Sequence, residues 1–233
     1  MYSFDSKVRF SEIDSNGNLN ILGILNYFQD SSTLQSDELG IGMDKLHKDK
    51  MAWVLSTWQI DVFNYPRLSE KITVGTFPYE FRGFFGRRNF VMKNADGEVL
   101  AMADTLWTLI DLEEVKPVRA TEEILNTYVL EEKLPMDYQK GRIHVPSELK
   151  KLEDIKVKAH NLDANNHVNN GQYIEMMLDE IENSYFKRLR VEYRKQAKLG
   201  DILTPYVYED DSIIVGLFKD RSGDTTTVME FTK

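Results

Sequence analysis

The sequence contains no cysteine, which excludes disulfides, thiolate metal sites, iron–sulfur clusters and cysteine nucleophiles together. It also has no apolar run near the roughly 18 residues of a membrane span and no N-terminal signal pattern, so we expect a cytoplasmic protein without membrane insertion. Basic residues are outnumbered, 29 against 38 acidic ones. The resulting net charge of −9 argues against a nucleic-acid partner.

Several common catalytic motifs are absent as well. There is no Gly-x-Ser-x-Gly elbow, no Gly-x-x-x-x-Gly-Lys phosphate loop and no His-Glu-x-x-His zinc helix. The segment that starts at Asp14 resembles a calcium loop, but its glycine is misplaced and its twelfth position is Leu25 where a bidentate Glu is needed. We therefore predict no metal and no cofactor.

What the sequence does contain is an internal repeat. Residues 13–20 (Ile-Asp-Ser-Asn-Gly-Asn-Leu-Asn) align with residues 162–169 (Leu-Asp-Ala-Asn-Asn-His-Val-Asn), and a stretch with helical periodicity follows each copy. Residues 60–72 align in the same way with 191–203, as paired half-buried strands, and the turn at 94–98 aligns with that at 220–224. The chain thus carries one plan twice.

Each copy has one helix followed by consecutive strands, an order that predicts an α+β fold with antiparallel sheets. We place an N-terminal unit at residues 1–132 and a C-terminal unit at 133–233, with the charged stretch 116–136 as the connection and a short helix at 121–125. The first unit has 13 basic and 21 acidic residues, and the second has 16 and 17.

The second copy of the repeated segment carries the chemistry. Asp163 can act as or position a base, Asn165 can orient water or a carbonyl, and His167 can transfer a proton near neutral pH. The following helix start, at Val168 and Asn169, offers backbone N–H groups for an oxyanion. The alternative is that the Asp and Asn residues only cap the turn. The first copy has Asn18 where the second has His167, which indicates that the imidazole is the functional addition.

The run Leu-Asp-x-Asn-x-His-Val-Asn-Asn-x-x-Tyr at 162–173 resembles the signature of acyl-acyl-carrier-protein (acyl-ACP) thioesterases of the bacterial type, and Tyr193-Arg194-Lys195 extends the resemblance. The resemblance implies a double hotdog, in which two helices are wrapped by a shared antiparallel sheet. It also implies a cytoplasmic thioester hydrolase that releases free fatty acid from an acyl carrier protein and so ends or diverts fatty acid synthesis.

Carried across from the family, Asp163, Asn165 and His167 match its catalytic acid, amide and imidazole. Plant members have an acidic residue and a Cys where this chain has Gln196 and Ala197. Gln196 can hydrogen-bond a water but cannot accept a proton at neutral pH, so we expect water to attack the thioester directly. Glu192 is a weaker candidate base, which we expect to be a solvated strand residue.

Two further sets of residues are candidates for substrate contacts. The first set consists of large apolar side chains, which could line an acyl pocket or simply form part of the core. Its members are Ile24, Leu25, Phe28, Trp53 and Trp58. The second set is a run of basic residues, which could bind an acidic carrier protein or simply form a solvated face. Its members are Arg188, Arg190, Arg194, Lys195 and Lys198. A second basic cluster comprises Arg82, Arg87 and Arg88.

Other functions use the same residues. An acyl-coenzyme-A thioesterase would share the site and differ in the charges at its entrance. A non-catalytic acyl-binding protein would keep the fold without turnover, an option that Gln196 keeps open. The sequence also leaves both a monomer and a dimer of double hotdogs open.

Overall fold

A computed structural model describes residues 1–181 and 185–233 of the chain. It divides into two compact units, Met1–Tyr138 and Gln139–Lys233. The division lies somewhat later than the expected one after Glu132, because the last residues of the first unit bond to its sheet. The backbone N–H of Leu134 and the hydroxyl of Tyr138 both donate to Asn89 Oδ1, at 3.0 and 2.9 Å.

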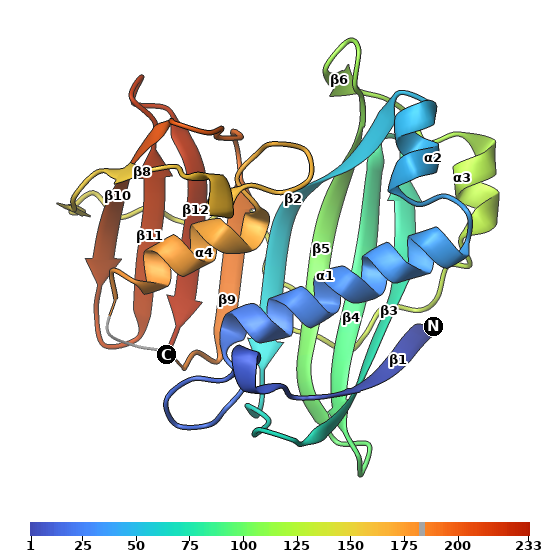
Figure 1. The fold of residues 1–233 in the computed structure, drawn as a ribbon, viewed down its shortest axis with the longest axis horizontal. Coiled ribbons are helices and arrows are strands. Elements are labelled where there is room, and N and C mark those ends of the chain that lie inside the picture. The colour runs from blue at the N-terminus through green and yellow to red at the C-terminus, as the bar shows by residue number, and fades with distance from the viewer. Residues whose placement is uncertain (182–184) are drawn as a thin grey trace. The chain divides into compact units, whose positions relative to one another are not determined.

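The first unit is an antiparallel sheet with a long helix across one face (Figure 1). The strands run in the order β1-β3-β4-β5-β2, and β6 pairs with β5. Its elements are β1 (Tyr2–Lys7), α1 (Ile21–Glu38), α2 (Met43–Lys48), β2 (Met51–Val62), β3 (Lys71–Arg82), β4 (Phe85–Asn94), β5 (Val99–Asp111), β6 (Lys116–Pro117) and α3 (Glu122–Thr127).

Helix α1 begins where the repeat predicts it. The Asn20 side chain caps it by accepting from the Gly23 N–H at 2.7 Å. The first half of the helix packs on the sheet through Phe28, whose ring lies 6.4 Å from that of Trp58 and 5.4 Å from that of Phe90. These three aromatic residues are almost completely buried and form the centre of this unit's core.

The second unit repeats the arrangement in shorter form, with α4 lying along its sheet (Figure 1). The strand order is β9-β12-β11-β10-β7, and β8 pairs with β10. Its elements are β7 (Lys150–Lys151), β8 (Ile155–Lys156), α4 (Asn170–Leu178), β9 (Arg188–Tyr193), β10 (Ile202–Glu209), β11 (Ile213–Lys219) and β12 (Thr225–Thr232).

Close approach of α4 to the sheet depends on Gly216 in β11. A Cβ atom at this position would lie 2.6 Å from the sulfur of Met177 on the helix, far inside van der Waals contact. The Tyr173 ring lies 6.1 Å from that of Phe218 on the same strand. The predicted α+β class, with antiparallel strands and one main helix in each unit, is confirmed.

The repeat is visible in individual hydrogen bonds. In the hairpin of the first unit, Asn94 Oδ1 accepts from the N–H groups of Asp96 and Glu98 at 3.0 and 2.9 Å. In the second unit, Asp220 Oδ1 accepts from Ser222 and Asp224 at 2.9 and 3.0 Å. The same turn is therefore built from aligned residues in both units.

Candidate active site

The turn at 162–169 is organised around one carboxylate oxygen. Asp163 Oδ1 accepts from the backbone N–H groups of Asn165 and His167, at 2.8 and 3.1 Å. The Asp163 N–H donates to the His167 carbonyl at 2.8 Å and closes the turn. Asn166 takes the left-handed conformation that such a tight turn needs, with φ of 61°. These contacts hold the backbone of the predicted catalytic residues in a fixed shape.

The first unit builds the same turn without an imidazole. Asp14 Oδ1 accepts from the N–H groups of Asn16 and Asn18 at 2.9 and 3.1 Å, and the Asp14 N–H donates to the Asn18 carbonyl at 2.9 Å. Capping is thus a real structural role of the aspartate in both copies, as the structural alternative expected. It accounts for Asp163 Oδ1 but not for His167, which replaces Asn18 at the matching position.

A second segment is fixed beside this turn. His167 forms a backbone bridge with Lys198, and the Val168 N–H donates to the Ala197 carbonyl at 2.9 Å. The structure thereby brings Gln196, next to Ala197 in the chain, close to the imidazole-bearing turn. Both segments belong to the second unit, so this unit contains all four predicted catalytic residues.

Two tyrosines secure the start of α4 against these segments. The Tyr193 hydroxyl donates to the carbonyl of Asn170, the first residue of α4, at 3.0 Å. The Tyr173 hydroxyl accepts from the Ala197 N–H at 3.0 Å. Burial raises the pKa of Tyr193 and raises the pKa of Tyr173 to about 12, so both hydroxyls stay protonated at neutral pH. The sequence resemblance included both tyrosines but assigned them no role.

Several polar side-chain groups of the four predicted catalytic residues make no hydrogen bond within these two segments. Asn165 and Gln196 are exposed, and Asp163 and His167 are half-buried. Within the described chain, the second carboxylate oxygen of Asp163, the His167 ring and both amide groups have no hydrogen-bond partner in the protein. These groups are therefore free to bind water or substrate.

The predicted oxyanion donors need a correction. The Val168 N–H is used by Ala197, and the Asn169 N–H donates to the Asn161 carbonyl at 2.9 Å. Asn169 is instead the N-cap of α4, because its side chain accepts from the Gly171 N–H at 2.8 Å. Among the described residues, the Asn170 N–H has no acceptor. Asn170 is thus the donor that the helix start leaves available.

Glu192 also differs from the expectation of a solvated residue. It is 8% exposed, its Oε1 accepts from the Ile143 N–H at 2.5 Å, and its Oε2 pairs with Arg194 at 2.6 Å. A carboxylate with both oxygens bonded in this way is a structural group. The sequence could not show this, because Ile143 lies far away in the chain.

Four of the five acyl-pocket candidates lie together in the first unit. Ile24, Leu25 and Phe28 are fully buried on α1, and Trp58, which is 1% exposed, stacks on Phe28. Trp53 is apart from this group. It packs with Phe81, at a ring distance of 6.0 Å, against a separate cluster that includes residues of α2 and α3.

Most of the docking candidates form ion pairs with acidic residues of the same unit. Arg190 pairs with Glu230 at 3.4 Å, and Lys195 pairs with Asp220 and Asp224 at 2.5 and 2.7 Å. Arg194 pairs with Glu192, and Arg188 is half-buried. Lys198 is exposed, and its ammonium has no ion-pair partner among the residues described.

The second basic cluster is not a surface patch. Arg88 is 7% exposed and its guanidinium lies inside the first unit, whereas Arg87 pairs with Asp104 at 3.0 Å. Only Arg82 of the three is exposed.

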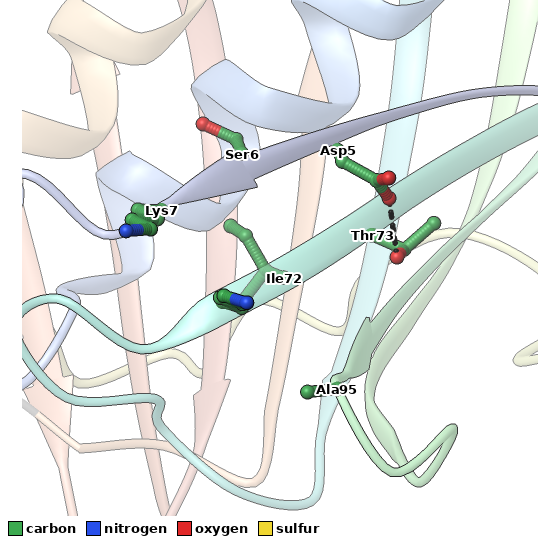
Figure 2. A pocket seen from close by; sticks show the side chains of 7 residues that line it. Asp5, Ser6, Lys7, Ile72, Thr73 and Ala95 are labelled. Carbon is green, nitrogen blue, oxygen red and sulfur yellow. Dashed lines mark hydrogen bonds between the residues drawn. The ribbon is translucent and has the colours of Figure 1, made fainter.

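A pocket elsewhere on the first unit contains none of the predicted site residues. It lies where β1 pairs with β3 and is lined by Asp5, Ser6, Lys7, Lys71, Ile72, Thr73 and Ala95 (Figure 2). Thr73 Oγ1 donates to Asp5 Oδ1 across the two strands at 2.7 Å. The described residues contain no group of three or more His, Asp or Glu side chains placed to hold a metal ion. None of the described helices is both long and apolar enough to cross a membrane.

Known proteins share this architecture. A crystal structure of an acyl-ACP thioesterase from Bacteroides thetaiotaomicron superposes with a TM-score of 0.90 at 24% identity, over 99% of this chain and 96% of that one. The 12:0-ACP thioesterase from Umbellularia californica gives a TM-score of 0.87 at 19% identity, over 99% and 96% of the two chains. Together with the two repeated units, these likenesses define a double hotdog protein.

Family models identify the chain more closely. The acyl-ACP thioesterase N-terminal domain matches residues 1–128, and the acyl-ACP thioesterase C-terminal domain matches residues 145–229. The chain therefore belongs to the acyl-ACP thioesterase family of thioester hydrolases, which act on fatty acyl-ACP. Oleoyl-acyl carrier protein thioesterase 2, chloroplastic, from Arabidopsis thaliana is 25% identical over 97% of this chain, which spans 68% of that relative. A palmitoyl-acyl carrier protein thioesterase from Gossypium hirsutum is 22% identical over 91% of the chain, which spans 56% of it.

Proposed function

We propose that this chain hydrolyses fatty acyl-ACP to free fatty acid and holo-carrier protein, with water as the nucleophile. The observation that carries the proposal is the difference between the two repeated turns. Both are built on the same aspartate contacts, and only the second adds an imidazole, beside a free carboxylate oxygen and an unused helix N–H.

In the proposed reaction, His167 accepts a proton from water as the water oxygen attacks the thioester carbonyl carbon. The second oxygen of Asp163 holds the water or stabilises the imidazolium, and the amides of Asn165 and Gln196 orient the water and carbonyl. The Asn170 N–H donates to the oxyanion. The C–S bond then breaks, and the leaving sulfur takes the proton from His167. A carboxylic acid and a free thiol are the products.

The absence of cysteine supports direct attack by water, since no thiol of this chain can form an acyl-enzyme. Gln196 has no proton-accepting group at neutral pH, which leaves the base role to His167 and Asp163. We place the reaction in the cytoplasm, at the point where carrier-bound chains leave fatty acid synthesis. We propose Lys198 as the first contact of the docked carrier, because its charge is exposed and beside the turn.

The test is a substrate panel on purified protein. Acyl-ACP and acyl-coenzyme A with the same acyl group are compared, and the released thiol is measured with a thiol reagent. The enzyme itself contributes no background because it has no cysteine. We expect faster release from acyl-ACP. Equal or faster release from acyl-coenzyme A would favour that substrate class, and binding of acyl-ACP without release would favour a non-catalytic protein.

A further inference from the structure

The buried face of α1 changes from apolar to polar halfway along the helix. Its first half buries Ile24 and Phe28, whereas its second half buries Ser31 and Ser32, at 0% and 6% exposure. Gln35 follows on the same face, since positions three and four apart lie above one another on a helix. The helix thus presents small polar side chains to the interior of the first unit where an ordinary core would have large apolar ones.

A buried guanidinium lies beneath this polar half. Arg88 donates to Gln35 Oε1 and, at 3.2 Å, to Thr76 Oγ1. Its guanidinium also lies 5.4 Å from the ring centre of Tyr128, whose hydroxyl shares a hydrogen bond with Ser36 Oγ at 2.7 Å. All of these partners are uncharged. Among the described residues, no carboxylate lies within ion-pair distance of Arg88.

The neighbouring Arg87 shows the usual arrangement. It lies on the opposite face of β4, because successive strand residues alternate, and it pairs with Asp104 at 3.0 Å. A buried charge without a partner is costly, and burial accordingly lowers the pKa of Arg88. The protein keeps this uncompensated charge in its interior.

An unpaired donor lies in the same row of the sheet as Arg88. Arg88 and Trp58 both pair with Thr105, on β4 and β2 to either side of β5. They are two strands apart, or roughly 10 Å at ordinary strand spacing. Trp58 is 1% exposed, and its indole N–H has no hydrogen-bond partner. Buried donors are rarely left unpaired in folded proteins, so this one points to a missing acceptor.

We propose that the row formed by Arg88 and Trp58 is a subsite for acyl chains that carry an oxygen atom away from the thioester. The inference rests on the proposed function. Guanidinium and indole N–H groups only donate, so a fitting ligand must supply an acceptor, as a hydroxyl, oxo or carboxylate group does. A plain methylene chain supplies none and leaves the Trp58 N–H unpaired and the Arg88 charge without a counter-ion, and sites with buried polar groups discriminate strongly against such ligands.

The test compares matched substrates. Plain dodecanoyl-ACP and hexadecanoyl-ACP are set against the same chains with a mid-chain hydroxyl, a mid-chain oxo group or a terminal carboxylate. For at least one oxygenated chain we expect kcat/KM about tenfold or more above that of its plain counterpart, the size of effect that one buried hydrogen bond to a charged group gives. Preference for the plain chain in every pair would overturn the proposal.

The variant Arg88→Met removes the donors but keeps a long side chain. It should lower the preference by about tenfold or more, because hydrolysis of the oxygenated chain falls more than hydrolysis of the plain chain. Arg87→Met is the matched control and should keep the preference. An equal loss on plain and oxygenated chains in Arg88→Met would show that Arg88 only holds α1 to the sheet.

Trp58→Phe covers the case in which Arg88→Met does not fold. It keeps an aromatic ring against Phe28 and removes the unpaired N–H, and it should also lower the preference. A wild-type protein that hydrolyses none of the substrates would overturn the proposed function instead. The subsite would then be tested by binding, with the tryptophan fluorescence of the wild type and of Trp58→Phe titrated by the free oxygenated and plain fatty acids; the difference between the two proteins is the signal of Trp58. Equal affinity for both would overturn it.

Discussion

At the scale of single residues, Asp163 and Asp14 separate what the repeated turn needs for folding from what it adds for chemistry. Each aspartate uses one oxygen to accept two backbone N–H groups. In the second copy alone, the residue that donates the second of these N–H groups carries an imidazole, and that residue is His167. The aspartate is therefore a folding residue in the first copy and, in our proposal, both a folding and a catalytic residue in the second.

The substitution Asp163→Asn isolates the catalytic part. The amide oxygen can still accept both N–H groups, so we expect the free energy of unfolding to change by less than about 1 kcal/mol. Loss of the charge should lower kcat on acyl-ACP by about 10²-fold or more. Asp14→Asn is the matched control and should leave kcat unchanged. Similar kcat values for the two variants would contradict the catalytic role of Asp163.

Asp104 predicts a pH dependence of stability. Burial raises its pKa to about 6, against the pull of Tyr79 and Arg87, from an ordinary value of 3.8. The folded state then holds a proton that the unfolded state has released, so this group makes stability fall as pH rises from about 4 to 6. The cost, up to about 3 kcal/mol, is fully present above pH 6.

Urea unfolding of the wild type and Asp104→Asn between pH 4 and 7 measures this effect. The variant has no titrating group at this position, so its stability relative to the wild type should increase over that range. A difference that stays constant with pH would contradict the assignment.

The sequence singles out His167 as a candidate, because comparing two copies of one segment shows which position has changed, and its catalytic role stays a prediction. The sequence does not show which backbone N–H is left without an acceptor. An N–H at a helix start is free only if no carbonyl from another segment accepts it. Here the carbonyls of Ala197 and Asn161 do accept, and their positions depend on the fold. The burial of Glu192 against the Ile143 N–H has the same origin.

At the scale of elements, the start of α4 is held by side chains from outside the helix. The Tyr193 hydroxyl, on β9, bonds the Asn170 carbonyl, and the carboxamide of Asn169 caps the helix. The proposed oxyanion donor, the Asn170 N–H, lies between these two contacts. The position of the helix start is therefore linked to the chemistry.

Tyr193→Phe should lower both the stability of the protein and its kcat, to different degrees. Loss of one partly buried hydrogen bond should lower the free energy of unfolding by about 1 kcal/mol. Displacement of the helix start should lower kcat on acyl-ACP more than it raises KM, because an oxyanion forms only in the reaction. Asn20→Ala is the control, since it removes the N-cap of α1, the counterpart of the Asn169 cap, and should lower stability without a change in kcat. A loss of stability alone in Tyr193→Phe would contradict the linkage.

The main helices could be predicted from apolar periodicity and their Asn caps, but their lengths could not. Helix α1 continues to Glu38 through Ser31, Ser32 and Gln35, where the apolar pattern has ended. Strand β1 and helix α2 were not predicted. Strand β1 is defined by pairing with β3, which lies far along the chain, and α2 is only one to two turns long.

At the scale of the whole molecule, the two units share a plan but differ in charge and chemistry. The tandem architecture could be predicted because three aligned segments recur in the same order. The basic run at 187–198 could not be evaluated from sequence, because net charge says nothing of which cations are paired. Of the five docking candidates, Arg190, Arg194 and Lys195 are paired within their own unit and Arg188 is half-buried, which leaves Lys198 among the described residues.

A charge reversal tests the remaining docking cation. Lys198→Glu should lower kcat/KM on acyl-ACP several-fold at low salt, with the effect shrinking as salt is added, because exposed charges are screened. Hydrolysis of neutral acyl-pantetheine should change little. Arg221→Glu, at another exposed arginine of the same unit, is the control. Equal effects on the carrier-bound and the neutral substrate would contradict docking through Lys198.

In our proposal, the imidazole added to one of two equivalent turns makes this chain an enzyme. The most direct measurement is kcat on acyl-ACP for His167→Ala beside Asn18→Ala, the same substitution at the matching position of the first unit. We expect a fall of about 10²-fold or more for His167→Ala and a kcat near that of the wild type for Asn18→Ala. Full hydrolysis by His167→Ala would contradict it.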